Sequence, residues 1–144
     1  MKNFYNIFNT FGLKFQHLSL LIIRLVLAYG FYETAVPKWQ NIEPTAQWFA
    51  SMGFPLPFLS VYLVAIFEAL AVPLFVLGLF ARIISVPLIV IVLVAIFAVH
   101  FGNGYSLANN GFEVPLYYLV MLFAIFSFGA GKISLDAVMN RYER

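Results

Sequence analysis

The apolar segment Leu56–Phe80 constrains the fold of this chain more than any other stretch. It is long enough to cross a bilayer, which takes about 20 apolar residues, and it carries a single charged residue, Glu68, near its middle. A carboxylate at that depth costs roughly 2.5–3.5 kcal/mol on insertion scales, so we expect Glu68 to face a polar protein interior. Two roles fit this position: a hydrogen bond that fixes helix packing, or a functional acid.

The composition places the whole chain in a membrane. Only 10% of its 144 residues are charged and 63% are hydrophobic, whereas soluble domains carry about 25% charged residues. The mean hydropathy is +0.94. We therefore predict an integral membrane protein, a single domain over residues 1–144 with the lipid bilayer as its main partner. The net charge of +2 is too small to indicate a surface that binds nucleic acid.

The chain contains no cysteine, which excludes disulfides, thiolate-bound metals and cysteine-held iron–sulfur clusters. A haem held by two histidines is also disfavoured, because His17 and His100 fall at opposite ends of the predicted bundle. A carboxylate site built from Glu33, His100 and Glu113 has no diagnostic spacing. We therefore predict neither a metal ion nor an intrinsic cofactor.

Four membrane crossings are predicted, joined by short connections. Pro37 is expected to end the first, with Lys38 and Trp39 anchoring it at the interface. Pro73 and Pro87 lie inside later crossings and are expected to bend them, which opens space between helices. The fold class is an all-α integral membrane protein, an antiparallel four-transmembrane-helix bundle with short interfacial helices. Its crossings are expected at about 18–36, 56–80, 83–101 and 113–129.

The segments outside the crossings are predicted to lie at the membrane surface. In residues 1–16 apolar side chains recur at helical spacing, which is typical of an amphipathic helix bent near Gly12; a frayed tail is the alternative. Thr45–Ser51 is predicted as a short interfacial helix with Trp48 and Phe49 facing the bilayer. The last segment, 132–144, is predicted to be a polar cytoplasmic tail.

The basic residues are divided unevenly between the two predicted sides of the membrane. The two loops on one side carry only Lys38, whereas the segments on the other side carry six lysines and arginines. Because basic residues are enriched in cytoplasmic segments, both termini are predicted to be cytoplasmic. The six residues are Lys2, Lys14, Arg82, Lys132, Arg141 and Arg144.

This topology sorts the polar residues by depth and predicts one polar cleft. Glu68 is central, Arg24 lies on its cytoplasmic side, and a larger set gathers near the outer face. Each residue alone is typical of a solvated helix end, but their collection on one side favours a functional site. The outer set comprises Glu33, Lys38, His100, Asn103, Glu113 and Tyr117.

Among the polar residues of this predicted cleft, we predict Glu68, His100 and Glu33 as the catalytic residues. Arg24 is predicted to pair with Glu68; its alternative is to extend to the lipid headgroups. His100 is suited to proton exchange near neutral pH, with Glu113 as its expected neighbour, and its alternative role is to cap the third crossing. The Gly- and Asn-rich loop after His100 is expected to form an open mouth. The predicted ligand-binding residues are Arg24, Lys38, Asn103, Glu113 and Tyr117.

Several segments, taken together, resemble the DoxX family of small four-helix bacterial membrane proteins. The resemblance covers about Leu18 to Asp136, and no single piece carries it. Thr34-Ala35 departs from it, because family members often carry His-Gly there. The matching pieces are Arg24 followed by Lys38, WFASMG leading to Pro55 and Pro57, IFEAL around Glu68, LGLFARI, VHFGNGY, NGFEVPLYY and GAGKISLD.

The resemblance implies the bacterial cytoplasmic (inner) membrane and a link to membrane redox systems. Family members include a subunit of a thiosulfate:quinone oxidoreductase and partners in oxidant-defence complexes. A quinone would fit an apolar space between bent helices, with electrons supplied by a soluble or membrane redox partner. Two alternatives stay open. One is a non-catalytic assembly or anchoring subunit. The other is a small proton-coupled transporter using Glu68, which would require a homodimer because the chain shows no inverted repeat.

Overall fold

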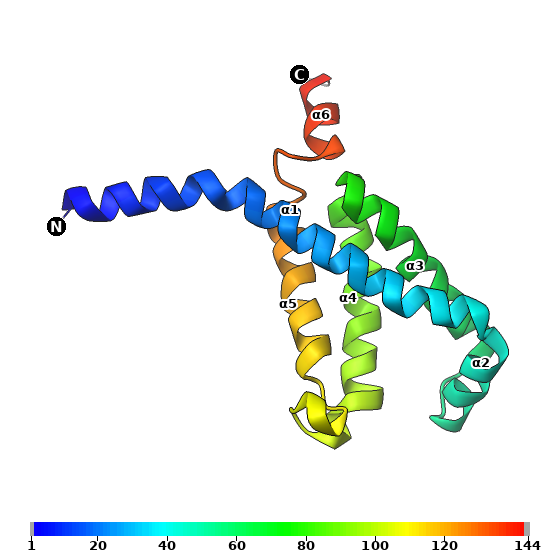
Figure 1. Cartoon of the computed structure of the whole chain (residues 1–144). Coiled ribbons are helices and arrows are strands. Elements are labelled where there is room, and N and C mark those ends of the chain that lie inside the picture. Colours follow the sequence, from blue (N-terminus) through cyan, green and yellow to red (C-terminus); the bar gives the residue numbers. More distant parts are fainter. Residues whose placement is uncertain (1, 143–144) are drawn as a thin grey trace.

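A computed structural model describes residues 2–142, and this range is helical, without strands (Figure 1). Met1 and residues 143–144, which belong to the predicted segments 1–16 and 132–144, lie outside the described residues. A π-helical turn and two 3-10 turns connect the fourth and fifth α-helices. The elements are α1 (Lys2–Gln40), α2 (Ile42–Ser51), α3 (Pro57–Leu77), α4 (Ala81–Ala95), η1 (Ile96–His100), η2 (Phe101–Asn103), η3 (Leu107–Asn109), α5 (Glu113–Phe128) and α6 (Leu135–Tyr142).

Three helical stretches are long and apolar enough to cross a membrane. They are Asn6–Gln40, Pro57–Leu77 and Ala81–Asn103, and they correspond to the first three predicted crossings. The helix α5 is also apolar but has only 16 residues, or about 24 Å of helical rise. The prediction of an all-helical membrane protein is therefore confirmed.

The first helix is longer than predicted at both ends. It is one helix of 39 residues, which Gly12 does not interrupt and Pro37 does not end. Proline removes one backbone donor, but the helix continues past it, so Lys38 remains on the helical surface. The N-terminal part of α1 extends away from the bundle in Figure 1, and its side chains Phe4, Ile7 and Phe8 are exposed.

The bundle is built from two pairs of helices. One pair is α1 and α3, and the other is α4 and α5 (Figure 1). The helices α1 and α3 are antiparallel, because Arg24 contacts Phe75 whereas Lys38 contacts Glu68. The pairs meet around side chains with no exposed area, among them Leu27, Phe75, Leu88 and Ile125. The contact between α1 and α5 is close, because a Cβ on Gly30 would lie 2.5 Å from Cζ of Tyr118.

The end of the bundle near the α3–α4 turn is closed by the segment that leads into α6. Arg24 has no exposed area, and its guanidinium donates to the backbone oxygens of Phe75 (3.3 Å) and Ile133. The carboxylate of Asp136 accepts from the backbone N–H groups of Phe80 (2.8 Å) and Ala81 (3.2 Å). Asp136 thus caps the N-terminus of α4, where backbone donors lack helical partners.

Candidate functional site

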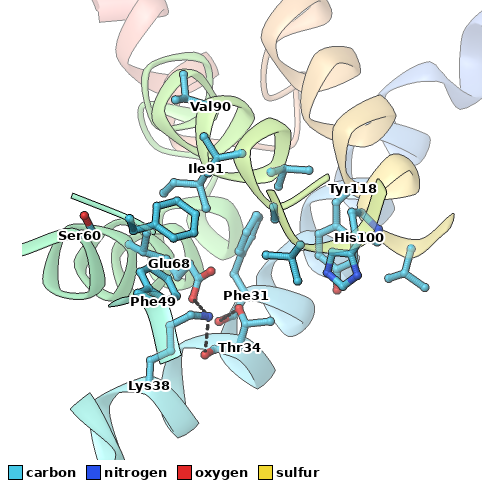
Figure 2. A pocket seen from close by; sticks show the side chains of 18 of the residues that line it. Phe31, Thr34, Lys38, Phe49, Ser60, Glu68, Val90, Ile91, His100 and Tyr118 are labelled. Carbon is cyan, nitrogen blue, oxygen red and sulfur yellow. Dashed lines mark hydrogen bonds and ion pairs between the residues drawn. The ribbon is translucent and has the colours of Figure 1, made fainter. Parts of the chain in front are cut away.

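A cavity of about 610 Å³ lies between α1, α3, α4 and α5, toward the end of the bundle that carries α2 and the η2–η3 loop (Figure 2). Its volume is within the range of roughly 300–1,000 Å³ that is usual for small-molecule sites. Most of its wall is apolar, supplied by side chains such as Phe31, Phe49 and Val92. The few polar groups on the wall therefore determine what it can bind.

The most buried polar group in the cavity is an ion pair between α1 and α3. The Nζ of Lys38 lies 2.8 Å from Oε2 of Glu68, and the two side chains are 21% and 6% exposed. The same Nζ donates to the backbone oxygen of Thr34 at 3.1 Å. Among the side chains that the structure describes, this is the one ion pair. Glu68 therefore faces the protein interior, and its partner is a lysine.

The predicted pairing of Arg24 with Glu68 is wrong. Because α1 and α3 are antiparallel, residues late in α1 lie beside residues early in α3. Arg24 and Lys38 are fourteen residues apart, about 21 Å of helical rise. Arg24 therefore reaches the last turn of α3 at Phe75, and Lys38 reaches Glu68.

A second polar group lies across the cavity from the ion pair. Figure 2 shows His100 and Tyr118 on the side opposite Lys38 and Glu68, and all four line the cavity. The Nδ1 of His100 lies 2.8 Å from the backbone oxygen of Asn110. Because a carbonyl oxygen only accepts, Nδ1 is the donor, and Nε2 is the ring atom that can exchange a proton with a ligand.

The loop between α4 and α5 is hydrogen-bonded to itself, and some of its residues line the cavity, whereas the predicted open mouth stays a prediction. Backbone N–H groups of Phe112 and Glu113 donate to Gly104 (3.1 Å) and Tyr105 (3.0 Å). The Glu113 carboxylate accepts from the backbone of Leu107 at 3.0 Å and from the Tyr117 hydroxyl at 2.9 Å. Glu113 therefore folds the loop and forms no ion pair with His100.

The structure brings three of the predicted site residues into one cavity: Lys38, Glu68 and His100. Asn103 does not line the cavity. Its side-chain amide donates, at 3.2 Å, to the same Asn110 backbone oxygen that His100 contacts. The other predicted residues do not line the cavity: Glu33, Arg24, Glu113 and Tyr117. Glu33 is exposed, because it lies on a different face of α1 from Lys38.

Sequence reasoning missed several residues of the wall. Phe49 was predicted to face the bilayer, but it is only 8% exposed and packs with Ala46 and Val61, whereas Trp48 is exposed as expected. The spacing of Ala46 and Phe49, three residues apart on one helical face, is the signal that indicates this burial. Other missed wall residues are Thr34, Ser60, Asn110 and Tyr118.

The model of the DoxX family matches residues 19–101, which is more than half of the 144-residue chain. The chain belongs to the DoxX family. The DoxX match confirms the resemblance seen in the sequence and contains Lys38, Glu68 and His100. The α5 wall of the cavity, with Tyr118, lies beyond the matched residues.

Two curated relatives of this DoxX protein cover most of its length. An uncharacterized protein of Haemophilus influenzae is 34% identical over 131 residues, covering 85% of this chain and 84% of that protein. The inner membrane protein YphA of Escherichia coli K12 is 32% identical over 124 residues, covering 81% and 87%. No solved structure matches the chain.

Proposed function

We propose that this DoxX protein is an inner-membrane subunit of a redox system and that its cavity binds a quinone or a similar small cyclic ligand. The observation that carries the proposal is the buried Lys38–Glu68 pair, which opens onto an apolar cavity with His100 on its opposite side. Apolar walls with a few convergent polar groups are typical of ligand sites. A charged pair at membrane depth is costly, which favours a functional reason for its presence.

A quinone matches this distribution of groups. It is a flat apolar ring with hydrogen-bond acceptor oxygens at opposite positions. The ammonium of Lys38 is placed to donate to one oxygen and the Tyr118 hydroxyl to the other, while Phe31 and Val92 contact the ring. Quinone reduction consumes protons and electrons. Glu68 and His100 are the groups that exchange protons here, and a redox partner protein supplies the electrons.

The proposed site is tested with the purified protein in lipid nanodiscs. We expect quinone in a solvent extract of protein purified from bacterial membranes. We also expect saturable binding of a tail-less benzoquinone, measured by calorimetry. Lys38→Met and Tyr118→Phe are expected to weaken binding about tenfold each, because each removes one donor to the ring. His100→Gln keeps a hydrogen-bonding side chain but cannot exchange a proton, so we expect it to slow the reduction of the bound quinone.

The matched controls are Lys132→Met and Glu43→Gln, which remove exposed charges outside the cavity. Both are expected to bind as the wild type does. If the wild type neither carries nor binds a quinone, the redox proposal is wrong. Proton uptake driven by a pH gradient in liposomes would then identify a transporter, and its absence would favour an assembly or anchoring role.

We further propose four crossings with both termini in the cytoplasm of a bacterial cell. The name of the E. coli relative places that protein in the inner membrane. Along the sequence, the six basic residues precede the first crossing, fall between the second and third crossings, or follow the fourth. With α5 as a fourth crossing, the two termini lie on the same side. Reporter fusions after Arg144 and within the loop at Ala108 are expected to report opposite sides; the same side for both would contradict this topology.

A further inference from the structure

The cavity is bordered on one side by apolar residues that are themselves exposed. Leu63 of α3 is 48% exposed, and Val90 and Val94 of α4 are 56% and 42% exposed, and all three line the cavity. The wall formed by α1 is closed, because Phe31 is only 3% exposed. The cavity therefore opens sideways, between α3 and α4.

This side opening lies at the depth of the lipid hydrocarbon. Val90 is nine residues after the start of the Ala81–Asn103 stretch and thirteen before its end, which places it about 14 Å and 20 Å from the two ends. The hydrocarbon core is roughly 30 Å thick, so Val90 is near its centre. Leu63 is six residues after the start of α3, or about 9 Å along the helix. The border residues are apolar, as lipid contact requires.

The end of the cavity nearest the membrane surface is covered by the chain itself. Leu107, Asn110 and Gly111 of the loop form part of the wall there. The loop is held in place by the contact of Asn110 with His100 and by the stacked rings of Phe101 and Phe112, whose centroids are 5.9 Å apart. The opening between α3 and α4 is bordered instead by apolar helical residues and faces the bilayer.

We propose that the cavity takes its ligand sideways from the bilayer, and that the ligand is a long-chain amphiphile with a hydrogen-bonding ring as its head. The head lies between the Lys38–Glu68 pair and His100, and the hydrocarbon tail leaves the protein over Leu63, Val90 and Val94. This inference rests on the proposed function, because it uses the same polar groups. It adds the class of the ligand, its direction of entry and the position of its tail.

The test compares two probes in nanodiscs: a tail-less benzoquinone and a quinone with a long isoprenoid tail. Val90→Trp and Leu63→Trp place a bulky ring across the path of the tail without changing the polar groups. We expect each to lower the affinity for the long-tailed probe about tenfold more than the affinity for the tail-less probe, because only the tail passes over these residues. The matched control is Val120→Trp, which changes a 62%-exposed residue of α5 outside the cavity.

A second measurement does not depend on how the tryptophan variants fold. Because the chain has no native cysteine, Val90→Cys carries a single fluorophore. We expect phospholipids brominated on their acyl chains to quench it, and the long-tailed probe to reduce that quenching. The Val120→Cys fluorophore is expected to be quenched equally with and without the probe.

The outcomes separate the two proposals. If neither probe binds the wild type, the proposed function is wrong and this inference falls with it. If both probes bind the wild type and the tryptophan variants lower neither affinity, or both equally, the tail does not leave between α3 and α4. Quenching at Val90→Cys that the long-tailed probe does not change would also contradict the inference.

Discussion

The variant Lys38→Met is expected to lose about 3–5 kcal/mol of unfolding free energy, because it leaves the Glu68 carboxylate buried without a partner. Glu68 is 6% exposed, so water cannot replace the ammonium of Lys38. Thermal unfolding in detergent micelles measures the effect, and we expect the melting temperature to fall by about 10 °C. Glu68→Leu is expected to cost less, because Lys38 is 21% exposed and can turn toward solvent.

A double-mutant cycle isolates the ion pair from the packing of either side chain. In Lys38→Met with Glu68→Leu no charge is left in the cavity, so we expect most of the loss to be recovered. Lys132→Met serves as the control for removal of a lysine and is expected to change stability by less than about 0.5 kcal/mol. Strictly additive losses in the double variant would contradict the coupling of Lys38 to Glu68.

The second large effect is expected for Gly78→Ala. Gly78 has φ +65°, a left-handed conformation that costs a residue with a side chain about 1–2 kcal/mol. A Cβ there would also overlap Nη1 of Arg24 and lie 2.5 Å from Cβ of Ser134. Arg24 would have to leave the Phe75 and Ile133 oxygens that it now contacts. Together these changes are expected to cost about 3 kcal/mol or more.

Gly53→Ala is the matched control for this variant. Gly53 has a similar φ of +79°, but a Cβ there would meet nothing within 4 Å. It is therefore expected to show only the backbone cost, about 1 kcal/mol. The difference between the two melting temperatures measures how firmly Arg24 is held. Equal losses would mean that the guanidinium moves aside without cost.

The helices of this protein could be predicted from the sequence because long apolar segments leave few alternatives in a membrane. Their ends were less predictable. Pro37 is a strong sign of a helix end, yet α1 continues to Gln40. That extra turn keeps Lys38 on the helix, where it reaches Glu68. The predicted helix end at Pro37 had instead placed Lys38 at the membrane interface.

The pairing of charges could not be predicted, because it depends on which helices are neighbours and in which register. Arg24 and Lys38 lie on the same face of α1, so from the sequence either could pair with Glu68. Only the antiparallel contact of α1 with α3 selects Lys38. His100 was placed correctly at the end of its helical stretch, but its partner Asn110 follows from the folding of an irregular loop. Such loops lack the periodicity on which sequence reasoning depends.

The contacts of Ile133 and Asp136 have a consequence for the order in which the protein is made. The ribosome adds these two residues after every helix from α1 to α5. Yet the backbone oxygen of Ile133 accepts a hydrogen bond from Arg24 in α1, and the Asp136 carboxylate accepts one from Phe80 at the N-terminus of α4. We infer that insertion can deliver all the long helices to the membrane before this end of the protein is complete. During that interval the Arg24 guanidinium lacks one of its two backbone partners. The final assembly step therefore waits for a late-synthesised segment of the chain.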